Sequence, residues 1–275
     1  METHIKCLTQ ACDNQKIKYQ SLDDEKNVIK VALGDGLLFQ QNRTPFNTEV
    51  IASICKDKGH THQILHKQVA MPKTIGFLDF NTHDHFQKYV NYPSQEAIIS
   101  EIERAFSYPV VVKRNRGALG INVFFCRDRS AVKAALDEIF NRNSCSYDYI
   151  ALAQEYIQPK QEFRVVFFRK ELLLCYQRVS ENKEFGLRYW DTNKGHALPI
   201  DDPEELSALT QFIKPALELP GLNYVGFDII KNHQGKYYLL EMNSGPKYNH
   251  YIQSCGEGEI IAMYEKMLRK ISAGS

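Results

Sequence analysis

The chain has 275 residues, which is enough for one large or two small domains with a substantial buried core. Its 34 basic and 33 acidic residues leave a net charge of +1, so no overall field directs it to nucleic acid or to an anionic membrane. Its 7 cysteines include no Cys-x-x-Cys pair, which argues against a disulfide framework and a zinc cluster. With no apolar run of about 18 residues, we expect a cytoplasmic protein that binds neither nucleic acid nor membrane. The formation of a homo-oligomer stays open.

The first third of the chain predicts small strands followed by helices. In residues 1–50, short apolar stretches alternate with polar turns, which favours strands around Gly34 to Gly36. The composition becomes helical from Thr48 to Gln68. A clearer helix begins after Ser94, a capping residue, and ends before Tyr108-Pro109. Its inward face repeats at helical spacing through Ile98, Ile102, Ala105 and Phe106.

The middle third predicts an α+β unit. Residues 109–113, "PVVVK", form a continuous apolar run typical of a strand covered on both faces. A glycine-bearing loop separates them from a second strand over 121–126, and a helix follows from Ser130. The stretch 149–157 predicts a strand that leaves this unit. The inward stripe of the helix contains Val132, Ala135, Leu136, Ile139 and Phe140.

The last third predicts two hairpins and two helices. "FRVVFF" and "LLLCYQRV" form a hairpin that turns near Arg169 to Glu171. A long helix opens at Asp202-Pro203 and is expected to kink at Pro215. "VGFDII" and "KYYLLEMN" are two further strands with Gly235 in their turn. A terminal helix is marked by Ile260, Tyr264, Met267, Leu268 and Ile271.

A basic loop follows the first buried strand of the middle unit. Lys113 ends that strand and precedes "RNRGALG", where Gly117 and Gly120 would let backbone N–H groups approach an anion. Arg114 and Arg116 add positive charge. The pattern favours a phosphate-binding cover, and an ordinary solvated turn is the alternative. Because it lacks Gly-Lys-Ser/Thr and a following helix, it is neither a Walker A motif nor a dinucleotide fingerprint.

Three oxygen-bearing side chains end the two strands near the C-terminus. If the strands form a hairpin through Gly235, Asp228 can pair near Glu241 on the neighbouring strand. Strand alternation places Glu241 and Asn243 on one face. Two carboxylates and an amide oxygen suit Mg²⁺, which also binds substrate phosphates. The alternative is a set of strand-end charges that face water.

Taken together, "PVVVKRNRGALGINV", "AQEYIQPKQEFRV" and "VGFDII…YLLEMNSGP" resemble the ATP-grasp superfamily, most closely its carboxylate-amine ligases. The resemblance covers roughly residues 58–254. It implies an α+β ATP-grasp fold, in which two α+β subdomains grip the nucleotide and a short N-terminal α/β segment precedes them. The implied boundaries are 1–57 for that segment, 58–153 for the subdomain with the phosphate loop, and 154–275 for the subdomain with the metal site.

The resemblance also implies roles for individual residues. Lys58 and Lys113 match the phosphate lysines, and Asp228, Glu241 and Asn243 match the metal ligands. Glu162 matches the acidic residue on the ribose, while Arg164 and Arg178 match catalytic residues that face the transferred phosphate and the activated carboxylate. The loop over the phosphates corresponds to Gly117, Ala118, Leu119 and Gly120. The adenine hinge corresponds to Gln154, Glu155, Tyr156 and Ile157, with Glu155 taking the exocyclic amine.

The implied activity joins a small-molecule carboxylate to an amine, with ATP and two Mg²⁺ ions, or Mn²⁺ in their place, as cofactors. The carboxylate attacks the γ-phosphate, and the amine displaces phosphate from the acyl phosphate. Water must be kept out, so residues 114–120 and 186–196 are expected to close over the site. The alternatives are an ATP-grasp kinase and a nucleotide-binding module without turnover.

Two departures from the family pattern concern the substrates. The segment before Lys58 is short for a substrate domain, so part of the acceptor site is either missing or supplied by another subunit. The stretch after the last strand, "SGPKYNHY", is more basic and aromatic than is usual. Lys247, Tyr248 and His250 are therefore expected to line the acceptor side.

Overall fold

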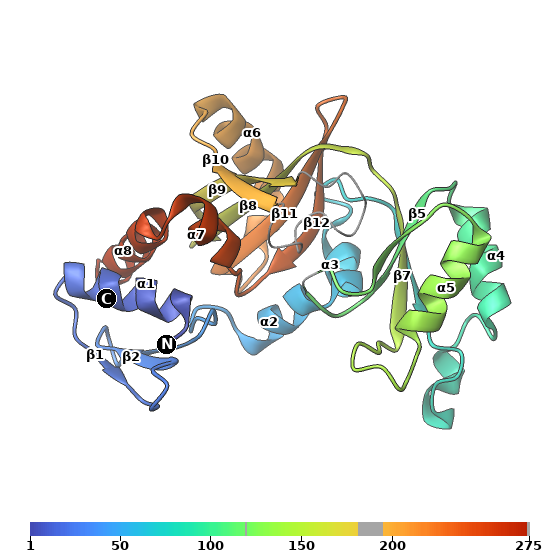
Figure 1. Cartoon of the computed structure of the whole chain (residues 1–275), viewed down its shortest axis with the longest axis horizontal. Coiled ribbons are helices and arrows are strands. Elements are labelled where there is room, and N and C mark those ends of the chain that lie inside the picture. Colours follow the sequence, from blue (N-terminus) through green and yellow to red (C-terminus); the bar gives the residue numbers. More distant parts are fainter. Residues whose placement is uncertain (119, 181–194, 274–275) are drawn as a thin grey trace.

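The structure is a computed structural model that describes residues 1–118, 120–180 and 195–273. Its strands form three sheets (Figure 1). The helices are α1 (Thr3–Asn14), α2 (Glu49–Lys56), α3 (Lys58–Leu65), η1 (Asp84–Tyr89), α4 (Gln95–Ala105), α5 (Arg129–Ile139), α6 (Pro203–Ile213), η2 (Lys214–Glu218), α7 (Asn249–Cys255) and α8 (Gly258–Ser272). The strands are β1 (Tyr19–Ser21), β2 (Val28–Val31), β3 (Leu37–Gln40), β4 (Thr74–Leu78), β5 (Val110–Arg114), β6 (Val123–Cys126), β7 (Ile150–Glu155), β8 (Pro159–Phe168), β9 (Glu171–Ser180), β10 (Gly195–Pro199), β11 (Tyr224–Asn232) and β12 (Tyr237–Asn243).

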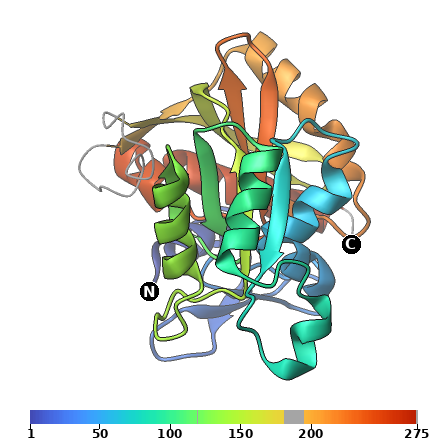
Figure 2. The same cartoon turned by 90° about the vertical axis from the view of Figure 1, so that its right-hand side faces the viewer.

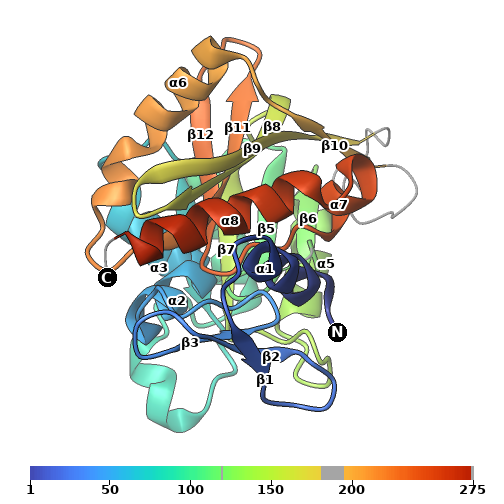
Figure 3. The same cartoon turned by 90° about the vertical axis from the view of Figure 1, so that its left-hand side faces the viewer.

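An antiparallel sheet of order β10-β9-β8-β11-β12 forms the larger body. Alternation along its strands creates two cores: Phe163 and Val165 pack with α6 and η2 on one face, and Val166 and Phe168 pack with α8 on the other. Figure 3 shows α8 lying across this sheet, with α1 beside it. Both faces are covered over much of the sheet, and the site residues lie farther along the face that α8 covers.

A second antiparallel sheet has the order β4-β7-β5-β6. Helices α4 and α5 cover one of its faces, as Figure 2 shows. Val110 and Val112 point into that core, while Val111 and Lys113 lie on the opposite face by alternation. That opposite face is the one that meets the larger sheet.

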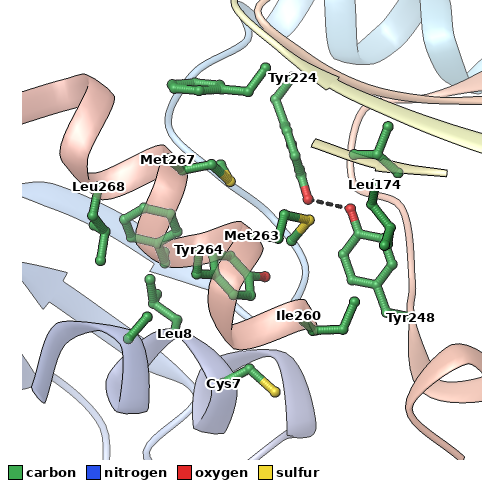
Figure 4. Close-up of a cluster of buried hydrophobic side chains, with 14 of the residues drawn as sticks. Cys7, Leu8, Leu174, Tyr224, Tyr248, Ile260, Met263, Tyr264, Met267 and Leu268 are labelled. Carbon is green, nitrogen blue, oxygen red and sulfur yellow. Dashed lines mark hydrogen bonds between the residues drawn. The ribbon is translucent and has the colours of Figure 1, made fainter. Parts of the chain in front are cut away.

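The N-terminal part combines α1 with a small sheet of order β1-β2-β3. Helix α1 packs against α8 through Cys7 and Leu8, inside a core that also contains the buried pair Tyr224 and Tyr248 (Figure 4). The phenolic oxygens of this pair lie 2.5 Å apart. The prediction of small strands around Gly34 to Gly36 is confirmed, but α1 was not predicted.

The predicted α+β class, the two hairpins and the terminal helix are confirmed, with three local corrections. The helical stretch 48–68 is broken at Asp57, whose side chain caps α3. Helix α5 is capped by Asp128 and begins at Arg129, one residue before the predicted start. Helix α7 was not predicted. None of the helices in the described ranges is long and apolar enough to cross a membrane.

Candidate functional site

The two larger sheets meet at a narrow cavity of about 100 Å³. The four-stranded sheet contributes Val111, Lys113 and Gln154 to its wall, and the five-stranded sheet contributes Ile230 and Leu240. Most of its wall is apolar, as is common for small-molecule sites. The remaining lining residues are Pro72, Val123, Glu155, Tyr156 and Ile157.

A β-bulge sets the geometry of the predicted metal ligands. Asp228 lies directly opposite Glu241 on the neighbouring strand, but Ile229 pairs with Leu239, so Leu240 is the extra residue. Bulges often re-aim side chains next to active sites. Here the bulge lets Leu240 line the cavity while Glu241 faces Asp228. The predicted pairing is therefore confirmed, and the ligand role of these residues stays a prediction.

Two arginines hold Asp228 in place. Arg164, directly opposite on β8, binds it with two hydrogen bonds: Nε donates to Oδ1 and a terminal nitrogen donates to Oδ2 at 2.9 Å. Arg178 lies 3.2 Å from Oδ1 and also pairs with Glu162 at 3.0 Å. Glu162, predicted to bind the ribose, is thus engaged by an arginine. Both predicted catalytic arginines border the same carboxylate.

The two carboxylates at the bulge differ in their electrostatic surroundings. Burial raises the pKa of Asp228 to about 6, against the opposing effect of Arg164 and Arg178. Burial is the largest effect on Glu241 and disfavours its charged form. The charge of Lys58, a hydrogen bond with Asp228 and the charges of Lys113 and Arg164 together outweigh it, so the pKa of that carboxyl lies well below its ordinary value. The Lys58 ammonium lies 3.5 Å from Glu241. Glu241 is therefore ionised at neutral pH.

The donor set fits a hard divalent cation. The amide nitrogen of Asn243 lies 3.4 Å from Asp228 Oδ2 and 3.2 Å from Glu241 Oε1, so the three side chains converge. A carboxylate offers about four lone-pair positions. The two arginines and Asn243 occupy those of Asp228. A cation would bind where Asn243 now donates, with the amide turned to present its oxygen.

The predicted phosphate lysine of the smaller sheet is almost fully buried. The side chain of Lys113 enters the cavity, and the residue is only 6% exposed. Its Nζ donates to Gln154 Oε1 at 2.9 Å. Burial, and then the nearby Lys58, lower the pKa of Lys113 to about 8. At neutral pH it still carries the charge that a phosphate requires.

The predicted phosphate loop is tied to the start of α3. Lys58 Nζ donates to the carbonyl of Gly117 at 2.7 Å, and Gly59 N donates to Asn115 Oδ1 at 2.8 Å. Gly117 has φ +143°, and a Cβ there would lie 2.1 Å from Arg114 Nε. This position requires glycine. Of the four predicted loop residues, Leu119 lies outside the described residues.

The predicted adenine hinge borders the same cavity. Glu155 backbone N donates to Lys73 O at 2.9 Å, which ties the end of β7 to the segment before β4. The ring of Tyr156 packs against Phe125, with 4.8 Å between centroids. Glu155, Tyr156 and Ile157 therefore lie beside Lys113 at the cavity. Their contact with a base stays a prediction.

The acceptor side differs from its prediction at one residue. Tyr248 is fully buried and bonded to Tyr224, so it belongs to the core beneath the site. His250 is partly buried, and burial and the charge of Arg178 lower its pKa. Lys247 is exposed. The predicted closing segment 186–196 lies outside the described residues, apart from Gly195 and His196 in β10.

Three polar residues that support the site were not predicted. Asp57 caps α3 and pairs with Arg116 of the loop at 3.4 Å. Asn115 accepts from Gly59, and Thr74 holds the amide of Gln154 at 2.9 Å. Asp57 is of a capping residue type inside the predicted helical stretch 48–68, and this was the available signal for a break there. The other two act across the fold and left no local pattern.

Comparisons with known proteins agree with this geometry. Residues 55–270 match the family model of the RimK-like ATP-grasp domain. A LysX protein of Sulfurisphaera tokodaii, an alpha-aminoadipate–LysW ligase, is 26% identical over 72% of this chain and 62% of its own length. A D-alanine–D-alanine ligase of Citrifermentans bemidjiense is 29% identical over 64% of this chain and 57% of its own.

A probable alpha-L-glutamate ligase of Alcanivorax borkumensis is 25% identical over 74% of this chain and 59% of its own length. The chain thus spans less than two thirds of each of these three relatives. A solved D-alanine–D-alanine ligase of Bacillus anthracis, complexed with ATP, superposes with a TM-score of 0.55 at 19% identity, covering 83% of this chain and 71% of its own. The family match spans both larger sheets and the cavity between them, and the chain belongs to the RimK-like ATP-grasp family.

Proposed function

We propose that the chain is an ATP- and divalent-cation-dependent ligase that joins a carboxylate to an amine through an acyl phosphate. One observation carries the proposal: Lys58 lies 3.5 Å from Glu241, so the phosphate loop and the predicted metal ligands meet at one point. The similar proteins named as ligases support the same activity. The substrates are expected to be an amino acid or a peptide and an amine.

Each group has a role in that reaction. Lys58 and Lys113 would bind the phosphates and neutralise the charge that spreads over the phosphoryl oxygens. Arg164 and Arg178 would orient the carboxylate and stabilise the oxyanion formed when the amine attacks. Asp228, Glu241 and Asn243 would hold Mg²⁺, as one or two ions, or Mn²⁺. When bound, the cation would draw charge from the phosphates.

The test is ADP release from Mg²⁺-ATP in the presence of pooled amino acids and dipeptides, followed by mass analysis. We expect a condensation product that needs both an acid and an amine. Adding hydroxylamine in place of the amine should trap the activated acid as a hydroxamate. ADP with a phosphorylated alcohol, and without hydroxamate, would replace the ligase with a kinase. Nucleotide binding without ADP release on any substrate would favour a binding module.

A matched pair of variants links the activity to the site. Lys113→Met removes the buried ammonium that lies in the cavity and should abolish ADP release. Lys170→Met removes an exposed lysine paired with Glu218 at 2.6 Å, far from the cavity, and should leave ADP release unchanged. Equal activity in both variants would refute the assignment of the cavity as the nucleotide site.

A further inference from the structure

A relay of hydrogen bonds runs from the backbone of Pro72 to the buried ammonium of Lys113. Thr74 Oγ1 donates to Pro72 O at 2.9 Å, and Gln154 Nε2 donates to Thr74 Oγ1 at 2.9 Å. Gln154 Oε1 then accepts from Lys113 Nζ at 2.9 Å. Lys113 and Gln154 are each 6% exposed. The Lys113–Gln154 bond is therefore shielded from solvent, where it is costly to lose, whereas Thr74 at the other end of the relay is partly exposed.

The relay allows one orientation of the Gln154 amide. The Thr74 hydroxyl uses its proton on Pro72, so it presents only lone pairs to Gln154. The amide must therefore turn its nitrogen to Thr74 and its oxygen to Lys113. The reversed amide would set two acceptors face to face at Thr74 and two donors face to face at Lys113. Lys113 and Thr74 thus favour the same orientation, in which the amide oxygen meets the lysine.

The register of the sheet places all three residues in line. Thr74 on β4 is directly opposite Gln154 on β7, which is directly opposite Val111 on β5. Lys113 lies two residues after Val111 and therefore on the same face. Pro72, Lys113 and Gln154 line the cavity, whereas Thr74 does not. Thr74 can influence a bound nucleotide only through its neighbours.

We propose that Gln154 is a positioning residue for Lys113, held in its orientation with the help of Thr74. This inference rests on the proposed nucleotide site. An ammonium has three N–H groups, and the Gln154 oxygen takes one, which leaves two to meet phosphate oxygens. A long lysine side chain loses considerable freedom when it is fixed. The relay fixes it before the nucleotide binds, so the phosphates meet an ammonium already in place.

The test compares the binding of ADP and adenosine by titration calorimetry, with the same Mg²⁺ concentration throughout. Gln154→Met should weaken ADP binding by about tenfold, the loss expected for one hydrogen bond to a charged group. It should leave adenosine binding within about twofold, because adenosine has no phosphate for Lys113 to hold. Thr74→Val should weaken ADP binding by a smaller factor and also spare adenosine. In a Lys113→Met background, Gln154→Met should cause no further loss.

The matched control is Gln177→Met. Gln177 accepts from Gln161 at 3.1 Å in the larger sheet and does not line the cavity. We expect it to bind both ligands as the unmodified chain does. If Gln154→Met fails to fold, Thr74→Val decides the question alone, since it disturbs the relay without touching the cavity.

Two results would overturn the inference and leave the proposed function intact. One is a loss of adenosine binding in Gln154→Met as large as the loss of ADP binding, which would mean that the side chain reads the base. The other is a full additional loss in the Lys113→Met background. If the unmodified chain binds neither ADP nor adenosine, the proposed nucleotide site itself is wrong.

Discussion

Replacing Asp228 with Asn should destabilise the protein more than replacing Glu241 with Gln. Both changes remove one charge from the predicted metal site. They differ in what they leave behind. Asp228 is only 6% exposed at its side chain and has two arginines around it, whereas Glu241 is 27% exposed and has Lys58 at 3.5 Å. The structural cost therefore falls on the first position.

The magnitudes follow from burial. Breaking a buried ion pair by removing one partner costs about 3–5 kcal/mol, because the other charge stays buried without compensation. The amide introduced by Asp228→Asn could still accept one hydrogen bond from Arg164, and burial already disfavours the charged form of Asp228, so we expect the lower end of that range. Solvent reaches 27% of the Glu241 side chain and screens its pair with Lys58, so we expect Glu241→Gln to cost less. Since domains are stable by roughly 5–15 kcal/mol, the difference should be measurable.

The assay is urea unfolding followed by far-ultraviolet circular dichroism, with slopes compared to check that the transition stays cooperative. The double variant Arg164→Met/Asp228→Asn should lose about 1–3 kcal/mol less than the sum of its single changes, since the two side chains contact each other. Equal destabilisation by Asp228→Asn and Glu241→Gln would refute the reasoning. So would strict additivity in the double variant.

Three further predictions concern the loop, the lysine and the core. Gly117→Ala should weaken ADP binding several-fold, because Gly117 has a positive φ and an added Cβ would contact Arg114. The control is Gly235→Ala, which should leave ADP binding unchanged because Gly235, with φ +80°, has open space around it. Equal ADP affinities in the two variants would contradict this prediction. Burial lowers the pKa of Lys113 from 10.5 in the unfolded chain to about 8 in the folded protein. Between these two pH values the unfolded chain binds more protons than the folded protein, so the free energy of unfolding should rise with pH. The Lys113→Met variant should lack this rise. The affinity for ADP should fall across the same window as the ammonium loses its proton, and a flat profile would contradict this. Tyr248→Phe should cost about 1–3 kcal/mol in urea unfolding by leaving the Tyr224 hydroxyl buried and unpaired, and Tyr224→Phe/Tyr248→Phe should cost less than the single change.

Local rules made much of the site predictable from the sequence. A glycine turn and alternation along two strands were enough to place Asp228 opposite Glu241, because hairpin register is set within a few residues. The helix faces of α4 and α5 followed from apolar spacing in the same way. The bulge was not predicted. The bulge places Leu240 in the wall of the cavity, and the alternation of residues along the strand gives no sign of it.

Contacts between segments far apart in the chain could not be predicted from the sequence. Strand β8 lies beside β11 although Arg164 and Asp228 are 64 residues apart, and alternation alone gives no sheet order. The same holds for α1. Its apolar face packs against α8, at the other end of the chain. From the local pattern alone, this region was predicted to contain short strands and polar turns. Tyr248 was misplaced for a related reason, since its buried partner Tyr224 comes from β11.

The charges around the cavity explain why a cation and a nucleotide should enter together. Four basic side chains meet three carboxylates there, so the phosphates of a nucleotide alone would face the repulsion of Asp228 and Glu241. A divalent cation alone would face the nearby lysines and arginines. When the cation and the nucleotide bind together, the cation faces the carboxylates and the phosphates face the basic side chains. Each ligand would therefore raise the affinity of the site for the other. The groups concerned are Lys58, Lys113, Arg164, Arg178, Glu162, Asp228 and Glu241.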